Sequence, residues 1–170
     1  MESSLRYIMI ILTIVLTGLS AGLFYAWEVS VIPGTRKLDD RIYLQTMQSI
    51  NRAILNPLFF AIFFGPALFL VISTAMEFRQ GLSFAFWFML ISTVLYLLGT
   101  FGITAFGNVP LNNTLDVLDF NQLINSELNT FRKSYEQPWN HLHRIRTICS
   151  IASFVTFLIA TYFNTISTKI

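Results

Sequence analysis

The chain is poor in charge, and its charged residues are gathered into short segments. Only 12% of its 170 residues are Asp, Glu, Lys or Arg, whereas a soluble domain has about 25%. Charged residues are absent from four long stretches, namely 7–27, 53–76, 80–115 and 147–168. These absences exclude an ordinary water-soluble domain and predict an integral membrane protein whose first partner is the lipid bilayer.

Two further scarcities limit the possible cross-links and partners. Cys149 is the only cysteine, so the chain cannot form an internal disulfide. It lies inside the last charge-free stretch, where a small buried apolar residue is the simplest interpretation. The formal net charge is only +2, which gives no reason to expect nucleic acid or an acidic protein as a partner. The sequence does not predict an oligomeric state.

Each charge-free stretch is long enough to cross a bilayer as a helix. About 20 residues at a rise of about 1.5 Å span the ~30 Å hydrocarbon layer. Backbone groups inside lipid must bond to one another, and long uncharged runs do so as helices rather than as a barrel. The four spans take up more than half of the chain and leave no room for a second domain. We therefore predict an all-α membrane protein in which residues 1–170 form a single bundle of four transmembrane helices.

Two short amphipathic helices are predicted in the long loops. The first span should stop at Pro33-Gly34, and a helix that begins near Asp39-Asp40 should run into the second span near Asn51-Arg52. After the third span, residues 107–113 precede a second amphipathic helix at about 114–135, which Pro138 is expected to break.

Four spans place both termini on one side of the membrane and the two long loops, 33–52 and 107–146, on the other. The loop side carries eight Lys and Arg residues and the terminal side carries three. Because basic residues are enriched in cytoplasmic loops, we expect the long loops to face the cytoplasm.

Polar residues gather at the loop-side end of every span. They are Glu28 in the first span, Asn51, Arg52 and Asn56 at the second, Asn108 and Asn112 after the third, and Trp139, Asn140, His143, Arg144 and Arg146 before the fourth. Two interpretations compete. Ionisable groups at bundle depth usually face an interior or a cavity, whereas polar residues also mark the membrane–water interface.

The spacing within the last group favours a site. Trp139, His143 and Arg146 fall on one face of a helix, because residues three and four apart are neighbours there. Histidine suits a base near neutral pH, and an arginine suits an oxyanion. The asparagines could orient a phenol or a carbonyl, while Trp139 and Tyr25 could stack on an aromatic molecule.

Structural roles explain the same residues equally simply. His143 could be a hydrogen-bonded interfacial histidine, and Arg144 and Arg146 could anchor the last span at the headgroups. Asn56-Pro57 and Asn108 could satisfy broken backbone as caps. His141 and His143 point to different helix faces, so we expect no metal site.

Four segments in order resemble the signatures of the anthrone oxygenase-like family of integral membrane proteins. They are residues 21–34, 47–57, 107–112 and 139–147. Fungal members oxidise anthrones to anthraquinones with molecular oxygen and no established cofactor, while most bacterial members have no assigned function. The resemblance implies an oxidoreductase of a bacterial cytoplasmic membrane that uses no cofactor. One position departs from the family pattern, since Glu28 stands where a small polar residue is expected.

The resemblance and the residues together define the expected site. His143, Arg146 and Glu28 are the candidate catalytic residues, with His143 or Glu28 as the base and Arg146 holding the anion. The candidate substrate-binding residues are Asn51, Asn56, Asn108, Asn112, Trp139, Asn140 and Tyr25. The competing hypothesis is a non-enzymatic membrane module that binds a lipid or quinone or supports a partner complex.

Overall fold

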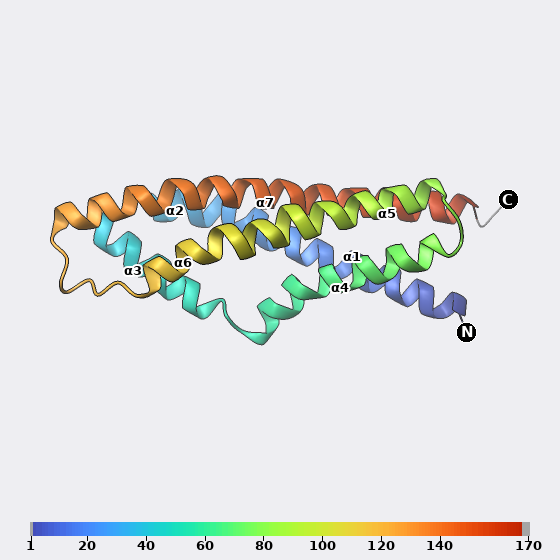
Figure 1. The fold of residues 1–170 in the computed structure, drawn as a ribbon, viewed down its shortest axis with the longest axis horizontal. Helices are drawn as coiled ribbons and strands as arrows, with labels where there is room; N and C mark the ends of the chain where they lie inside the picture. The colour runs from blue at the N-terminus through green and yellow to red at the C-terminus, as the bar shows by residue number, and fades with distance from the viewer. Residues whose placement is uncertain (1, 168–170) are drawn as a thin grey trace.

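The computed structural model describes residues 2–167, with side chains described for residues 4–163, and every regular element in that part of the chain is helical. Four helices are long and apolar enough to cross a membrane: Ser4–Thr35, Pro57–Phe78, Phe84–Asp116 and Asn125–Phe163. They run alternately up and down as a bundle, with both termini at one end and the two long connections at the other (Figure 1). The predicted fold class is confirmed.

Each span is built from one or more labelled elements. The first consists of α1 (Glu2–Ala26), η1 (Trp27–Val31) and α2 (Ile32–Thr35), and the second is α4 (Pro57–Phe78). The third consists of α5 (Phe84–Val94), η2 (Leu95–Gly102), η3 (Thr104–Asn108) and α6 (Val109–Asp116). The fourth is α7 (Asn125–Ser167), and α3 (Asp40–Ala53) lies in the first long loop.

Three of these elements, η1, η2 and η3, are wound as π-helix. The π-helix is rare, and its short insertions into α-helices occur frequently at functional sites. Here they interrupt the first and third spans toward the loop-side end of the bundle. Each insertion adds a residue to a helical turn and so changes which side chains face the interior beyond it.

Hydroxyl groups join the spans to one another within the bundle. Ser92 and Ser153 each donate to the other's backbone carbonyl, at 2.7 and 2.8 Å. Further hydroxyl pairs are Thr13 with Ser73, Ser20 with Tyr96, and Thr74 with Thr93. Because lipid supplies no hydrophobic drive between helices, small residues and interhelical hydrogen bonds are what such bundles use instead.

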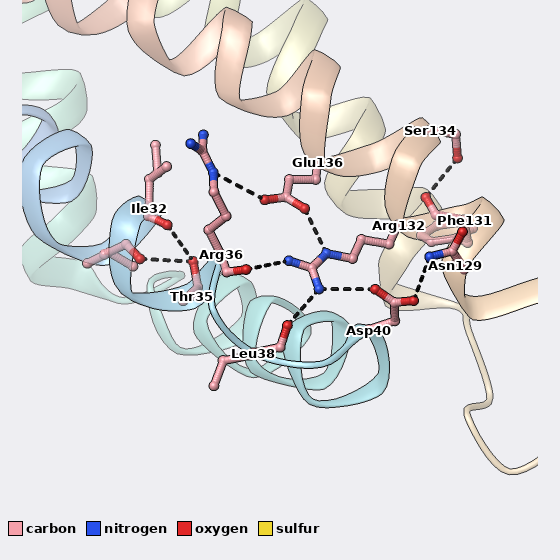
Figure 2. Close-up of polar contacts among 11 residues, drawn as sticks. Ile32, Thr35, Arg36, Leu38, Asp40, Asn129, Phe131, Arg132, Ser134 and Glu136 are labelled. Atoms are coloured by element: carbon pink, nitrogen blue, oxygen red, sulfur yellow. Dashed lines mark hydrogen bonds and ion pairs between the residues drawn. The ribbon is translucent and has the colours of Figure 1, made fainter. Parts of the chain in front are cut away.

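A helical cap covers the loop-side end. α3 and the first turns of α7 bury an apolar cluster that includes Tyr43, Leu44, Leu128 and Tyr135. Arg132 ties the cap together by donating to the carbonyls of Leu38 and Arg36 and to the carboxylates of Asp40 and Glu136, as Figure 2 shows. Its guanidinium also lies 4.2 Å from the ring centroid of Tyr43.

The junctions at the first long loop differ from the sequence prediction. The first span continues through Pro33 and Gly34 to Thr35. α3 forms as predicted but does not run into the second span, because the chain leaves the helix at residues 54–56. The side-chain oxygen Oδ1 of Asn56 then accepts from the backbone N–H of Phe59, and Pro57 occupies the first helical turn of α4. This is a regular N-cap, which agrees with the capping interpretation of Asn56-Pro57.

The third span is longer than predicted. Residues 107–113 are not a loop, since the helix continues through Pro110 to Asp116. Pro110 lies at the start of α6, directly after a π-helical segment, where its missing N–H breaks no regular α-helical bond. The extension places Asn108 and Asn112 on one continuous helix rather than in a flexible connection.

The predicted helix at 114–135, ended by Pro138, is wrong. Residues 117–124 form turns. Two side chains of α3 bind the backbone at and beside these turns, since Gln48 donates to the carbonyl of Leu115 and Arg41 to the carbonyl of Leu123. The remaining residues belong to α7, which passes through Pro138 without a break. Pro138 is exposed, so the carbonyl freed by its missing N–H lies on the outer face of the helix.

Candidate functional site

A cavity of about 180 Å³ lies at the loop-side end of the bundle, and all four spans line it. The first span contributes Leu23, Phe24 and Trp27, and the fourth contributes Trp139, His143 and Arg146. The remaining lining residues are Asn51, Arg52, Ile54, Leu55, Phe59, Thr104, Val109, Asn112, Asn113 and Asp116. Most of the surface of the wall is apolar, although half of the lining residues carry polar or charged side chains.

Arg146 brings a buried positive charge to this cavity. Its side chain lies between the rings of Phe24 and Trp139, with guanidinium-to-centroid distances of 4.8 and 5.1 Å. Among the described residues, no carboxylate lies within ion-pair distance of it. Taking a cation out of water costs several kcal/mol when no partner compensates it. An arginine kept in this state favours a ligand that supplies the negative charge.

The hydrogen bonds of Arg146 leave part of its guanidinium available. Nε and Nη2 both point at Nδ1 of His143, at 3.1 and 2.8 Å, and Nη1 donates to the Thr104 hydroxyl at 3.3 Å. A guanidinium carries five N–H groups. One N–H on each Nη therefore has no acceptor among the described residues, and these two groups could bind an oxygen.

The surroundings of His143 fix its tautomer. Because arginine only donates, Nδ1 must be the unprotonated acceptor. Nε2 then carries the hydrogen, and it lies 3.2 Å from the Phe24 carbonyl and 3.3 Å from the Thr147 hydroxyl. The ring is fully buried and stacks on Trp139 at 5.1 Å with an interplanar angle of 6°. His143 is thus neutral at rest, and its only lone pair faces a cation.

A chain of polar contacts holds the aromatic wall. Asn51 donates to the Tyr135 hydroxyl at 3.1 Å, and that hydroxyl donates to the Asn112 side chain at 3.2 Å. The same Asn112 oxygen accepts from the Trp139 indole at 2.7 Å. Asn108 donates to the backbone carbonyl of Trp139 at 3.1 Å. Asn108 and Asn112 of the extended third span therefore position Trp139.

Glu28 reaches the site from the side opposite the cavity. Its Oε1 accepts from Arg144 at 3.1 Å, and its Oε2 lies 3.9 Å from Nε2 of His143. Oε2 is buried and accepts no hydrogen bond from the described residues. Glu28 does not line the cavity and would act on a ligand there only through His143.

The structure brings together most of the residues singled out from the sequence. Asn51, Asn112, Trp139, His143 and Arg146 line the cavity, and Asn108 and Glu28 contact residues that do. Three others lie elsewhere. Tyr25 is 55% exposed on the outer surface of the first span, Asn56 caps α4, and Asn140 lines a separate surface hollow with His141 and Arg144.

Sequence reasoning missed Trp27 and Thr104. Trp27 packs against Trp139 at a ring distance of 6.0 Å, and its buried indole N–H has no acceptor among the described residues. Thr104 accepts from Arg146. Both lie on π-helical segments, where an α-helical projection assigns the wrong face. Within the described residues, no group of three or more His, Cys, Asp and Glu side chains is arranged to hold a metal ion.

A comparison with known families identifies the family of the chain. The sequence model of the anthrone oxygenase family matches residues 57–156, which is more than half of the chain. The matched range contains the cavity residues of the third and fourth spans and confirms the family resemblance, although residues 21–34 and all but the last residue of 47–57 lie outside it. No curated protein and no solved structure matches the chain.

Proposed function

The chain belongs to the anthrone oxygenase family, and from this premise we propose that it binds a hydrophobic hydroxylated aromatic from the bilayer and oxidises it with molecular oxygen. The proposed substrate is anthrone-like, with a ring CH₂ group that becomes a carbonyl. In the overall change, one O₂ is consumed, the CH₂ becomes C=O and one water is released. No cofactor takes part in this proposal.

The observation that carries the proposal is the unpaired Arg146 inside an aromatic cavity. An anthrone-like molecule that loses a ring proton becomes an enolate, in which the negative charge rests on oxygen. The two free N–H groups of Arg146 would hold that oxygen, and a charge-assisted hydrogen bond in a dry site is worth more than in water. The electron-rich anion then reacts with oxygen directly.

The position of the cavity supports entry from lipid. Its wall includes Ile54 and Leu55, where the chain leaves α3 before α4 begins, and Val109 on the third span. Leu55 and Val109 are 64% and 40% exposed, beside the exposed Arg52–Asp116 ion pair. A molecule dissolved in the bilayer would reach the cavity between these residues without passing through water.

His143 would accept the proton only after a ligand has bound. At rest its Nδ1 is occupied by Arg146. When the N–H groups of Arg146 that now point at Nδ1 bind the ligand oxygen instead, Nδ1 becomes free to accept a proton. General base catalysis by a positioned imidazole contributes about 10²–10⁴-fold to a rate.

The same resting hydrogen bond favours the second candidate, a module that binds a quinone or lipid without chemistry. If Arg146 never releases Nδ1, the cavity binds an electron-rich oxygen and contains no base.

One experiment separates the two candidates. Purified protein in nanodiscs is given hydroxylated anthrones under air, before and after metal chelation, while oxygen consumption and ligand binding are measured. We expect oxidation above the spontaneous rate that the Arg146→Gln variant loses and the Arg144→Gln variant, a matched change on the exposed face of α7, retains. Saturable binding without oxidation would establish the binding module, and absence of both would overturn the proposal.

A further inference from the structure

Glu28, on the π-helical segment η1, contacts the buried ring of His143 with one carboxylate oxygen and the exposed side chain of Arg144 with the other, and it is itself 22% exposed. Oε1 pairs with Arg144, whose side chain is 64% exposed and lines a surface hollow of about 550 Å³. Oε2 is buried, without a hydrogen bond among the described residues, and faces the ring of His143 at 3.9 Å. A carboxylate held in this way connects the two environments.

The ring of His143 completes the connection. Its Nδ1 lies on the side of Arg146 and the cavity, whereas its Nε2 lies on the side of Glu28. An imidazole that accepts a proton at one nitrogen and releases one from the other carries a proton across its own width. The Nε2 hydrogen now points at the Phe24 carbonyl at 3.2 Å, and Glu28 Oε2 is the nearby group that could accept it fully.

A ligand that binds as an anion leaves a proton behind, and that proton needs an exit. Inside the cavity the charged residues are Arg146 and, at its edge, the Arg52–Asp116 ion pair. Arg146 cannot accept a proton, and Asp116 is already paired. His143 and Arg144 are the charged or titratable side chains that face Glu28 among the described residues.

We propose that Glu28 is the proton outlet of the site. This inference rests on the proposed function, because it requires a ligand that gives up a proton on binding or reaction. The proton leaves the ligand for Nδ1 of His143, and the bonding electron pair stays on the ligand. The Nε2 proton then passes to Glu28 Oε2, which restores the neutral ring, and the Glu28 carboxyl, whose side chain is 22% exposed, releases a proton to water beside Arg144.

The test measures proton release and does not depend on oxidation. A hydroxylated anthraquinone, which has no CH₂ group left to oxidise, is mixed with the protein in weakly buffered nanodiscs containing a pH-indicating dye. We expect binding to release protons, and the Glu28→Gln variant to release the same amount at least about tenfold more slowly. Glu28→Asp should restore much of the rate, as should millimolar formate added to Glu28→Gln.

Control variants and outcomes make the result specific. Lys133→Gln removes a positive charge that lines the same hollow without an ion pair to Glu28 among the described residues, so it should release protons at close to the wild-type rate. Thermal unfolding of Glu28→Gln checks that the bundle is intact. Proton release that is equally fast in Glu28→Gln would overturn the outlet while leaving the proposed function standing. Binding without proton release, or no binding, would overturn both.

Discussion

The guanidinium of Arg146 holds the lone pair of His143, with Nη2 at 2.8 Å from Nδ1, and the two side chains lie one helical turn apart on α7. Each side chain therefore limits the chemistry of the other. While the contact lasts, the imidazole cannot act as a base, and the Nε and Nη2 groups of Arg146 each have one N–H occupied by His143. A ligand that takes over the guanidinium changes both conditions at once.

Replacement of Arg146 should weaken ligand binding without weakening the fold. Arg146→Gln removes a buried cation that has no carboxylate partner among the described residues, so thermal stability in detergent should stay equal or increase. Affinity for a hydroxylated anthraquinone should fall about 10- to 100-fold, the equivalent of a charged hydrogen bond of about 1.5–3 kcal/mol. Fluorescence titration measures the affinity. A clear loss of stability with unchanged affinity would assign Arg146 a structural role only.

Replacement of Arg132 should have the opposite effect. Arg132→Met leaves the carbonyls of Arg36 and Leu38 and the carboxylates of Asp40 and Glu136 without their shared donor (Figure 2). The free energy of unfolding should fall by about 2–3 kcal/mol. The matched control is Arg36→Gln, because that side chain is 62% exposed and lies 3.9 Å from Glu136. Equal effects of the two changes would contradict the prediction.

The cap should also lose stability in acid. Hydrogen bonds from Asn129 and Arg132 hold the pKa of Asp40 below its ordinary value of 3.8. A carboxyl group whose pKa is lower in the folded protein contributes stability above its unfolded pKa, and the contribution disappears as the pH falls through the folded value. Melting temperatures measured downward from pH 5 should therefore fall less steeply in Asp40→Asn than in the wild type. Identical slopes would show that the carboxylate adds nothing.

A methyl group at Gly99 should separate the third and fourth spans. A Cβ there would lie 2.4 Å from Cys149 Sγ and 2.5 Å from its Cβ. Gly99→Ala should therefore destabilise the bundle by about 1–3 kcal/mol. Because the Cβ of residue 149 is itself too close, Cys149→Gly should relieve the strain in a double-mutant cycle and Cys149→Ala should not. Gly22→Ala, where no atom lies within 4 Å, is the neutral control.

The excess of basic residues on the loop side predicts that the two long loops face the cytoplasm. In a cysteine-free background made by Cys149→Ala, Arg36→Cys and Lys133→Cys introduce single labels into the two long connections. An impermeant thiol reagent should label them in inverted vesicles and leave them unlabelled in intact cells. Labelling in intact cells would reverse the orientation.

The spans were predictable from the sequence because the absence of charge is a property of composition. Four spans also place both long loops on one side of the membrane. The convergence of Asn51, Asn112, His143 and Arg146 at that end was therefore predictable as well. The detailed geometry was not predictable in this way. The π-helical segments are not visible in the hydrophobic pattern, and Trp27 and Thr104, which lie on them, line the cavity.

The cap shows a second limit of prediction from the sequence. The amphipathic stripe at 114–135 is real, but Arg41 and Gln48 of α3 bind carbonyls in and beside residues 117–124 that a helix would otherwise use. Pro138 is tolerated because Tyr135 and Trp139, both buried, keep the two halves of α7 in line. In both places tertiary contacts outweigh a local preference, which is about 3 kcal/mol for a proline inside a helix.

The interruption between α3 and α4 decides which half of the bilayer the cavity meets. It opens the wall only at the loop-side end, while Arg6, Glu77 and Ser83 join the helices at the other end. If the proposed function holds and the polar-substituted aromatic crosses slowly between leaflets, supply and removal of the ligand both depend on the loop-side monolayer. The same compound dissolved in the opposite monolayer would have to cross the bilayer before this protein could bind it.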